Sequence, residues 1–311
     1  MSWRAKATNT FGVLTVAICL VYLVDRLLHS GQGFVALVED PWIWMGLVVV
    51  GLAYAALLGL PVIAWGMLLR SSLQDRFEWL QVFRIYGVAN LGKFLPGNIF
   101  HFAGRQILAA RLGWPQSAVA GATLTETLLQ VITVSVVIAV ASIIEDRLGR
   151  ASLERVLEQW HIPWWVVVMV LLVGVSILLL APVILRRQQM MKFQMATADV
   201  ILASVLYMLF FVGNALLVSL AVRWIDVDGG SLSIMIGAGY LASWLVGFVT
   251  PGAPAGLGVR EATFTLIMGP FTGTTEALAI VLFMRLVTTL GDGLLFAATY
   301  RPLGASRNKS P

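Results

Sequence analysis

The chain has 311 residues, of which 59% are hydrophobic and only 12% are charged, whereas a soluble domain carries about 25% charged residues. This composition excludes an ordinary soluble enzyme. The formal net charge of +5 does not indicate a nucleic-acid partner, because basic residues of membrane proteins gather in cytoplasmic loops. Cys19 is the single cysteine, so the chain can form no disulfide with itself. No His, Cys or carboxylate cluster has metal-ligand spacing, and we expect neither a metal nor a cofactor.

Six uninterrupted apolar stretches follow one another along the chain. Each has about the 20 apolar residues that a helix needs to cross a hydrocarbon core of roughly 30 Å, and backbone polar groups at that depth require helices. The first stretch follows Arg4 and Lys6, as a signal peptide would, but no convincing cleavage site follows, so we predict that it is retained. The predicted spans cover residues 10–28, 42–69, 116–144, 163–185, 199–224 and 275–300.

Two further apolar stretches, 79–113 and 231–271, are interrupted midway by Gly and Pro. If neither crosses the membrane and the N-terminus is cytoplasmic, most Lys and Arg residues of the loops fall on the cytoplasmic side, as the positive-inside rule requires. If one of them crossed, the later loops would invert and this bias would fail. The sequence therefore predicts an all-α polytopic protein of the bacterial inner (cytoplasmic) membrane. It would have six transmembrane helices, two re-entrant helical hairpins, both termini in the cytoplasm and one transmembrane domain over residues 1–311.

The two interrupted stretches resemble each other. Each has a Tyr, an apolar helix, a Pro-Gly pair and, after seven more residues, an Arg followed by Gln or Glu: YGVANLGKFLPGNIFHFAGRQ and YLASWLVGFVTPGAPAGLGVRE. Each leads into a long span that carries a charge, Glu126 in the first copy and Arg285 in the second. Three spans separate the copies, so we expect an inverted repeat of units 79–144 and 231–301, an architecture of many secondary transporters.

Charged side chains in and beside the two repeat units mark a candidate site, because such groups are costly in a membrane and normally have a partner or line a polar cavity. They are Lys93, Arg105, Glu126, Arg260, Glu261, Arg285 and Asp292. The Pro-Gly breaks free backbone groups that are tolerated only where they are buried or line a water-filled cavity. The helices that follow, expected to begin near Asn98 and Ala255, would direct their positive ends at the membrane centre.

This combination favours an anion, since the planar guanidinium of Arg matches phosphate. We predict a phosphate or lipid-headgroup site at mid-membrane, in which Glu126 and Glu261 balance the arginines. The alternative is a structural ion-pair network that locks the hairpins to the spans. The candidate substrate-binding residues are Pro96, Gly97, Asn98, His101, Arg105, Glu126, Pro251, Gly252, Arg260, Glu261 and Arg285.

Two of these segments resemble signatures of the lysylphosphatidylglycerol synthase/flippase transmembrane family. The segment VTPGAPAGLGVREATF, residues 249–264, is similar to its C-terminal signature, and GKFLPGNIFHFAGR, residues 92–105, is similar to its N-terminal one. Arg285 falls where the family tends to place an arginine. Asn98 and His101 stand where many relatives have a Gly-Glu pair. The resemblance is to a stand-alone member without the aminoacyltransferase domain, which implies translocation of a phospholipid or a polyprenyl-phosphate-linked sugar.

The favoured hypothesis is a flippase-like lipid translocator of envelope lipid or glycan biogenesis that is not an enzyme. Its expected partners are the bilayer and an anionic lipid or lipid-linked phosphate, with a homo-oligomer or glycan-assembly partners left open. One alternative is a membrane-embedded transferase on a lipid-linked substrate, with Glu126, Glu261 or Asp292 as its base. The other is a non-transporting scaffold of a glycan-assembly complex.

Overall fold

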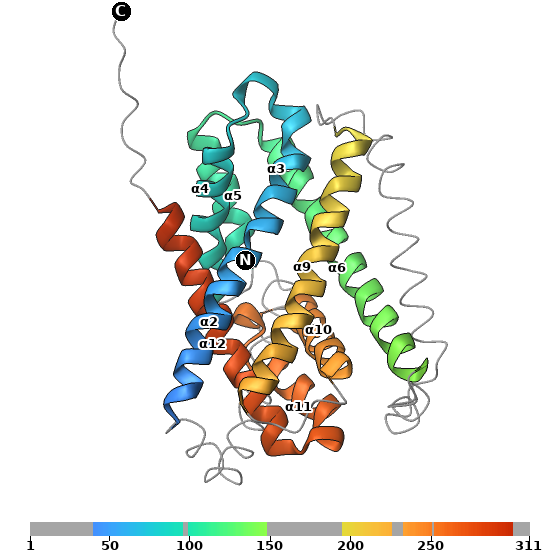
Figure 1. Cartoon of the computed structure of the whole chain (residues 1–311). Coiled ribbons are helices and arrows are strands. Elements are labelled where there is room, and N and C mark those ends of the chain that lie inside the picture. Colours follow the sequence, from blue (N-terminus) through green and yellow to red (C-terminus); the bar gives the residue numbers. More distant parts are fainter. Residues whose placement is uncertain (1–39, 96–98, 148–194, 226–232, 251, 301–311) are drawn as a thin grey trace, which may run out of the picture.

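The computed structural model describes residues 40–95, 99–147, 195–225, 233–250 and 252–300. Every element in this part of the chain is a helix (Figure 1). The α-helices are α2 (Pro41–Leu57), α3 (Gly59–Leu73), α4 (Trp79–Asn90), α5 (Phe100–Arg111), α6 (Gln116–Arg147), α9 (Thr197–Trp224), α10 (Ser233–Val249), α11 (Val259–Thr272) and α12 (Thr274–Thr299). Three short 3-10 helices join some of them: η1 (Gln74–Arg76), η2 (Leu91–Phe94) and η3 (Pro254–Gly256).

Four helical stretches are long and apolar enough to cross a membrane: Pro41–Arg76, Gln116–Ile144, Thr197–Trp224 and Thr274–Thr299. They coincide with four of the predicted spans, those at 42–69, 116–144, 199–224 and 275–300. The protein is therefore an all-α membrane protein. The predicted spans at 10–28 and 163–185 lie outside the described residues.

The first of these stretches consists of α2 and α3, which meet at Leu58, followed by η1. Leu58 keeps helical dihedral angles, φ −60° and ψ −17°, and its N–H still donates to the Tyr54 carbonyl at 2.9 Å. Pro61 has no N–H to donate to the carbonyl four residues before it. The interruption between α2 and α3 is therefore local, and the chain continues in the helical path predicted for 42–69.

Each interrupted stretch folds as helix, turn and helix: α4, η2 and α5 in the first copy, and α10, η3 and α11 in the second. The expectation of a helix start near Ala255 is wrong, because α11 begins at Val259. Ala255, Gly256 and Gly258 have φ values of 48°, 70° and 79°, and left-handed backbone cannot continue an α-helix. In the first copy α5 begins at Phe100.

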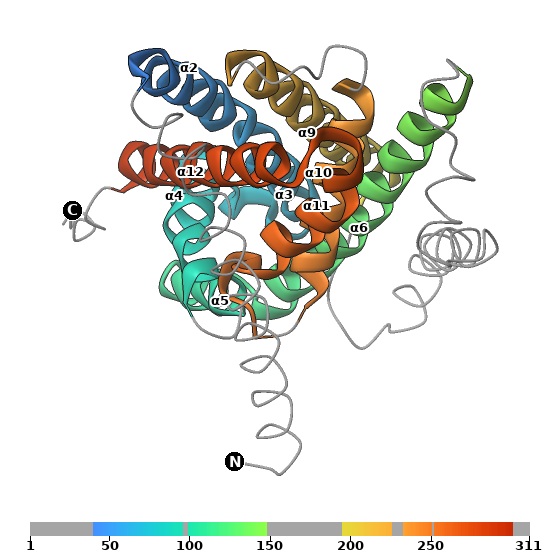
Figure 2. The ribbon, with the colours of Figure 1, turned by 90° about the horizontal axis from the view of Figure 1, so that it is seen from below.

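The two interrupted stretches lie at opposite ends of the long helices (Figure 1). The first helix of each packs against the span that follows the other, so that α4 contacts α12 and α10 contacts α6. The two turns also touch, since η2 contacts η3. Viewed from below, α12 lies between α2 and α4, while α6 lies toward the periphery (Figure 2). The turns and α12 therefore meet in the interior of the bundle.

Glycines allow α2 and α12 to approach closely. A Cβ atom added at Gly291 would lie 2.4 Å from the Tyr54 Cδ1 atom, and one added at Gly51 would lie 2.6 Å from the Leu290 Cδ2 atom. Small residues at helix crossings are the usual means by which membrane helices pack, because apolar surface gains little from leaving lipid. This packing holds α12 in place beside the two turns.

Candidate functional site

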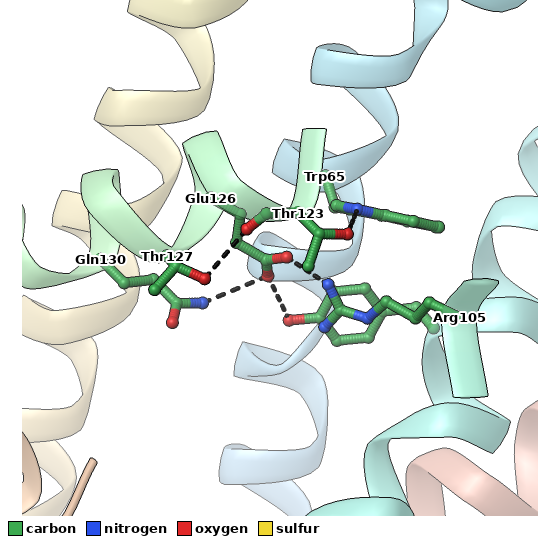
Figure 3. A network of polar contacts seen from close by, with 7 residues as sticks. Trp65, Arg105, Thr123, Glu126, Thr127 and Gln130 are labelled. Carbon is green, nitrogen blue, oxygen red and sulfur yellow. Dashed lines mark hydrogen bonds and ion pairs between the residues drawn. The ribbon is translucent and has the colours of Figure 1, made fainter. Parts of the chain in front are cut away.

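Arg105 of α5 and Glu126 of α6 form an ion pair in the first repeat unit (Figure 3). Their side chains are only 3% and 2% exposed. The Glu126 Oε1 atom also accepts hydrogen bonds from the Tyr86 hydroxyl at 2.9 Å and from the Gln130 side-chain amide at 3.2 Å. The carboxylate thus has a cation and two neutral donors, as a buried charge requires.

Aromatic rings enclose the guanidinium of Arg105. Its Cζ atom lies 3.8 Å from the centroid of the Tyr86 ring and 5.1 Å from that of Trp65, within the range of cation–π attraction. The Trp65 indole N–H donates to the Thr123 hydroxyl at 3.2 Å. Among the described residues the Arg105 Nε atom and the Tyr207 hydroxyl, both buried, have no hydrogen-bond partner. This cluster fastens α5 to α6 and to α3.

The second repeat unit has an ion pair of opposite polarity, with the acid on the short helix and the cation on the span. The Arg285 Nε atom of α12 lies 3.6 Å from the Glu261 Oε1 atom of α11. This separation is longer than a hydrogen bond. Arg285 Nη1 donates to the Ala255 carbonyl at 2.9 Å, so the arginine also ties η3 to α12. The Glu261 Oε2 and Arg285 Nη2 atoms are buried without a hydrogen-bond partner in the described part of the chain.

Arg260 precedes Glu261 on α11 and differs from the other cations of the site. Lys93, Arg105 and Arg285 each pair with a carboxylate. Within the described ranges, Arg260 pairs with none, and its buried Nε atom has no hydrogen-bond partner. Its Cζ atom lies 5.7 Å from the Trp244 ring centroid.

Two glycines hold the side chain of Arg260. A Cβ atom added at Gly247 would lie 2.5 Å from the Arg260 Cγ atom, and one added at Gly256 would lie 2.7 Å from its Nε atom. Any larger residue at these positions would displace the arginine or the turn. The left-handed φ of Gly256 adds a second reason for glycine there. The η3 turn and α10 therefore confine the side chain of Arg260, which has no carboxylate partner within the described ranges.

A third polar contact joins the two repeat units. The Lys93 Nζ atom of η2 lies 2.7 Å from the Asp292 Oδ2 atom of α12, and the Asn90 side-chain amide donates to Asp292 Oδ1 at 2.8 Å. The lysine side chain is 21% exposed, whereas that of the aspartate is 1% exposed. The short helix η2, which carries Lys93, contacts both η3 and α12. Lys93, Asp292, Arg260, Glu261 and Arg285 therefore form one polar region where the turns meet α12.

The remaining predicted site residues are less central. His101 is buried and its ring centroid lies 3.8 Å from that of Phe102, and its Nδ1 atom has no hydrogen-bond partner among the described residues. Gly252 is half-buried with φ 90°, a conformation that favours glycine. Pro96, Gly97, Asn98 and Pro251 lie outside the described residues.

Sequence reasoning did not find the neutral partners of the charged groups. Gln130 follows Glu126 by four residues, a spacing at which helix side chains meet, so it could have been found. Asn90 and Trp244 carry no such local signal, because their partners lie on other elements. Gly247 is one glycine among 29, and only the packing of Arg260 distinguishes it.

The described residues include no group of three or more His, Cys, Asp or Glu side chains that could hold a metal ion. Their chemistry is that of buried ion pairs around one unpaired guanidinium. Comparison with known proteins adds no relative: no protein-family model, no curated protein and no solved structure matches the chain.

Proposed function

We propose that the protein is a flippase-like lipid translocator that moves an anionic phospholipid or a polyprenyl-phosphate-linked sugar across a bacterial inner membrane, in the biogenesis of envelope lipids or glycans. The observation that carries the proposal is Arg260, whose guanidinium has no carboxylate partner among the described residues. An unpaired charge is costly within a membrane protein, so such residues mark substrate or ion pathways. A phosphate would supply the missing anion.

In this proposal Arg260 contacts the phosphate of the headgroup, and Glu261 and Arg285 line the same region while the lipid chains stay in the bilayer. Arg105 and Glu126 satisfy each other together with Tyr86 and Gln130. We therefore assign that pair to holding α5 on α6 rather than to substrate contact.

The proposal includes two re-entrant hairpins arranged as an inverted repeat, with access to the site alternating as one unit moves against the other. Three observations support it. The hairpins lie at opposite ends of the long helices, the first helix of each packs on the span that follows the other (α4 on α12, α10 on α6), and η2 contacts η3. Membership of the lysylphosphatidylglycerol synthase/flippase transmembrane family, with both termini in the cytoplasm, belongs to the same proposal. The resemblance of residues 92–105 and 249–264 to its signatures supports it.

Transport by reconstituted protein tests this function. The full chain and its Arg260→Gln variant are placed in liposomes with a fluorescent phosphatidylglycerol, and the rate at which the label becomes accessible from the other leaflet is measured. We expect the variant to lose transport while remaining folded, because the change removes one charge and keeps most of the side-chain length. Arg223→Gln is the matched control, since Arg223 is exposed in the last turn of α9. Wild-type transport by Arg260→Gln would contradict the proposal.

A scaffold that does not transport lipid is the second candidate. The observation that favours it is that three of the site's four cations already have carboxylate partners, as in a purely structural network. This candidate predicts that the purified protein carries no anionic lipid and that Arg260→Gln changes nothing. Native mass spectrometry of protein released from its own membrane separates the two, because the translocator holds an anionic lipid that Arg260→Gln removes.

A further inference from the structure

We infer that the site selects a headgroup with a single negative charge, a phosphodiester monoanion, over a diphosphate or a zwitterion. The inference rests on the proposed function and narrows its substrate class. Both phosphatidylglycerol and a sugar joined to a polyprenol through one phosphate have this chemistry.

The charge balance of the site leaves one positive charge. Its four cations are Lys93, Arg105, Arg260 and Arg285, and its three carboxylates are Glu126, Glu261 and Asp292. Every carboxylate has its own cation, so the excess belongs to Arg260. Uncompensated charge in a region of low dielectric constant is costly. A monoanion brings this region to neutrality, whereas a diphosphate leaves an excess of negative charge and a zwitterion brings another cation.

The geometry also provides for one phosphate. Gly247 and Gly256 confine the Arg260 side chain, and a confined guanidinium presents one planar fork that matches one phosphate group. A second phosphate would need a second free cation. The nearest cations are engaged: Arg285 by Glu261 and the Ala255 carbonyl, and Lys93 by Asp292.

Competition between defined lipids tests the selection. The purified full chain is offered equal amounts of phosphatidylglycerol, a polyprenyl phosphate hexose, a polyprenyl diphosphate hexose and phosphatidylethanolamine, and the bound species are counted by native mass spectrometry. We expect a monoanion to exceed both the diphosphate and the zwitterion by about tenfold or more, the difference that 1.4 kcal/mol produces. The more abundant of the two monoanions identifies the source of the headgroup.

Two variants test charge balance as the cause. Glu261→Gln adds one positive charge beside Arg260, and we expect it to shift the ratio toward the diphosphate by about tenfold. Arg260→Gln removes the excess charge and should abolish the preference, whereas Arg223→Gln, the exposed control, should preserve it. If Glu261→Gln does not fold, the wild-type ratio and the other two variants still decide.

The outcomes separate this inference from the proposed function. Arg260-dependent binding of the diphosphate or of phosphatidylethanolamine at least equal to that of the monoanions would overturn the selection and leave a lipid-binding site in place. A preference that folded Glu261→Gln leaves unchanged would overturn charge balance as its cause. The absence of any Arg260-dependent lipid would overturn the inference together with the translocator.

Discussion

Arg105 and Arg260 stand at matching positions nine residues after the prolines of the two Pro-Gly pairs, but their surroundings differ. The span after the first arginine presents Glu126, which neutralises it. The span after the second presents Arg285, a like charge that takes the neighbouring Glu261 as its partner. The carboxylate nearest to Arg260 along the chain is thereby engaged elsewhere. This difference at single positions pairs the arginine of the first copy with a carboxylate and leaves that of the second without one among the described residues.

At this scale we predict that Arg105 and Glu126 contribute to stability as a pair. Arg105→Met or Glu126→Leu alone should lower the free energy of unfolding by about 3–5 kcal/mol, because each leaves a buried charge without its partner. The double variant should recover most of the loss, since it leaves no charge to compensate. Thermal unfolding of detergent-solubilised protein, followed by tryptophan fluorescence, measures the midpoints. A double variant that is no more stable than either single variant would contradict the pairing.

Among the elements, η3 has the least regular backbone and depends on side chains for its shape. Ala255 adopts φ 48°, which is unfavourable for a residue with a Cβ atom. Its carbonyl accepts the hydrogen bond from Arg285 Nη1, and its neighbour Gly256 packs against Arg260. Two arginines from α11 and α12 therefore support the turn that the Pro-Gly break creates.

The prediction for this element is that Arg285→Lys loosens the turn while keeping its charge. A lysine ammonium on a different stem cannot reproduce both the contact with Glu261 and the hydrogen bond to Ala255, and a hydrogen bond from a charged donor contributes about 1.5–3 kcal/mol. Hydrogen exchange at residues 255–258 should become at least about tenfold faster. Exchange in α3, which packs on α4, α6 and α9, provides the internal reference. Unchanged exchange at 255–258 would show that Arg285 does not hold the turn.

At the scale of the whole molecule, each repeat unit packs against a helix of the other unit, and an ion pair joins them. The helix α4 packs on α12, α10 packs on α6, and Lys93 of η2 bonds to Asp292 of α12. Neither unit pairs all of its charged groups alone, because Lys93 of the first unit pairs with Asp292 of the second.

A disulfide can test this exchanged packing. A Cβ atom added at Gly87 of α4 would lie 2.9 Å from the Thr299 Cβ atom of α12, near the separation of about 3.5–4.5 Å that a disulfide spans. In a Cys19→Ser background, Gly87→Cys with Thr299→Cys should cross-link readily on oxidation, and peptide mass spectrometry would identify the bond. Gly87→Cys with Gly293→Cys is the matched control, because a Cβ atom at Gly293 meets nothing within 4 Å. Equal yields from both pairs would contradict the packing of α4 on α12.

The sequence by itself determined that this is a membrane protein, where four of its long helices lie, and which charged residues are available at its centre. Uninterrupted apolar length decides where helices can cross a membrane, which is why the stretch predicted at 116–144 coincides with the span found at Gln116–Ile144. The Pro-Gly pairs likewise marked both breaks, because proline and glycine act on the backbone locally.

Only the tertiary structure decided which charges are free. Arg105, Arg260 and Arg285 looked equivalent as candidates, but Arg105 and Arg285 find their partners on helices that are distant in the chain or on the opposite side of a turn. The late start of α11 has the same origin, since the left-handed backbone at Ala255 accompanies a contact with Arg285, 30 residues away. Helix propensity and apolar length are local properties, whereas the neutralisation of a buried charge depends on which side chains the packing brings within a few ångströms of it.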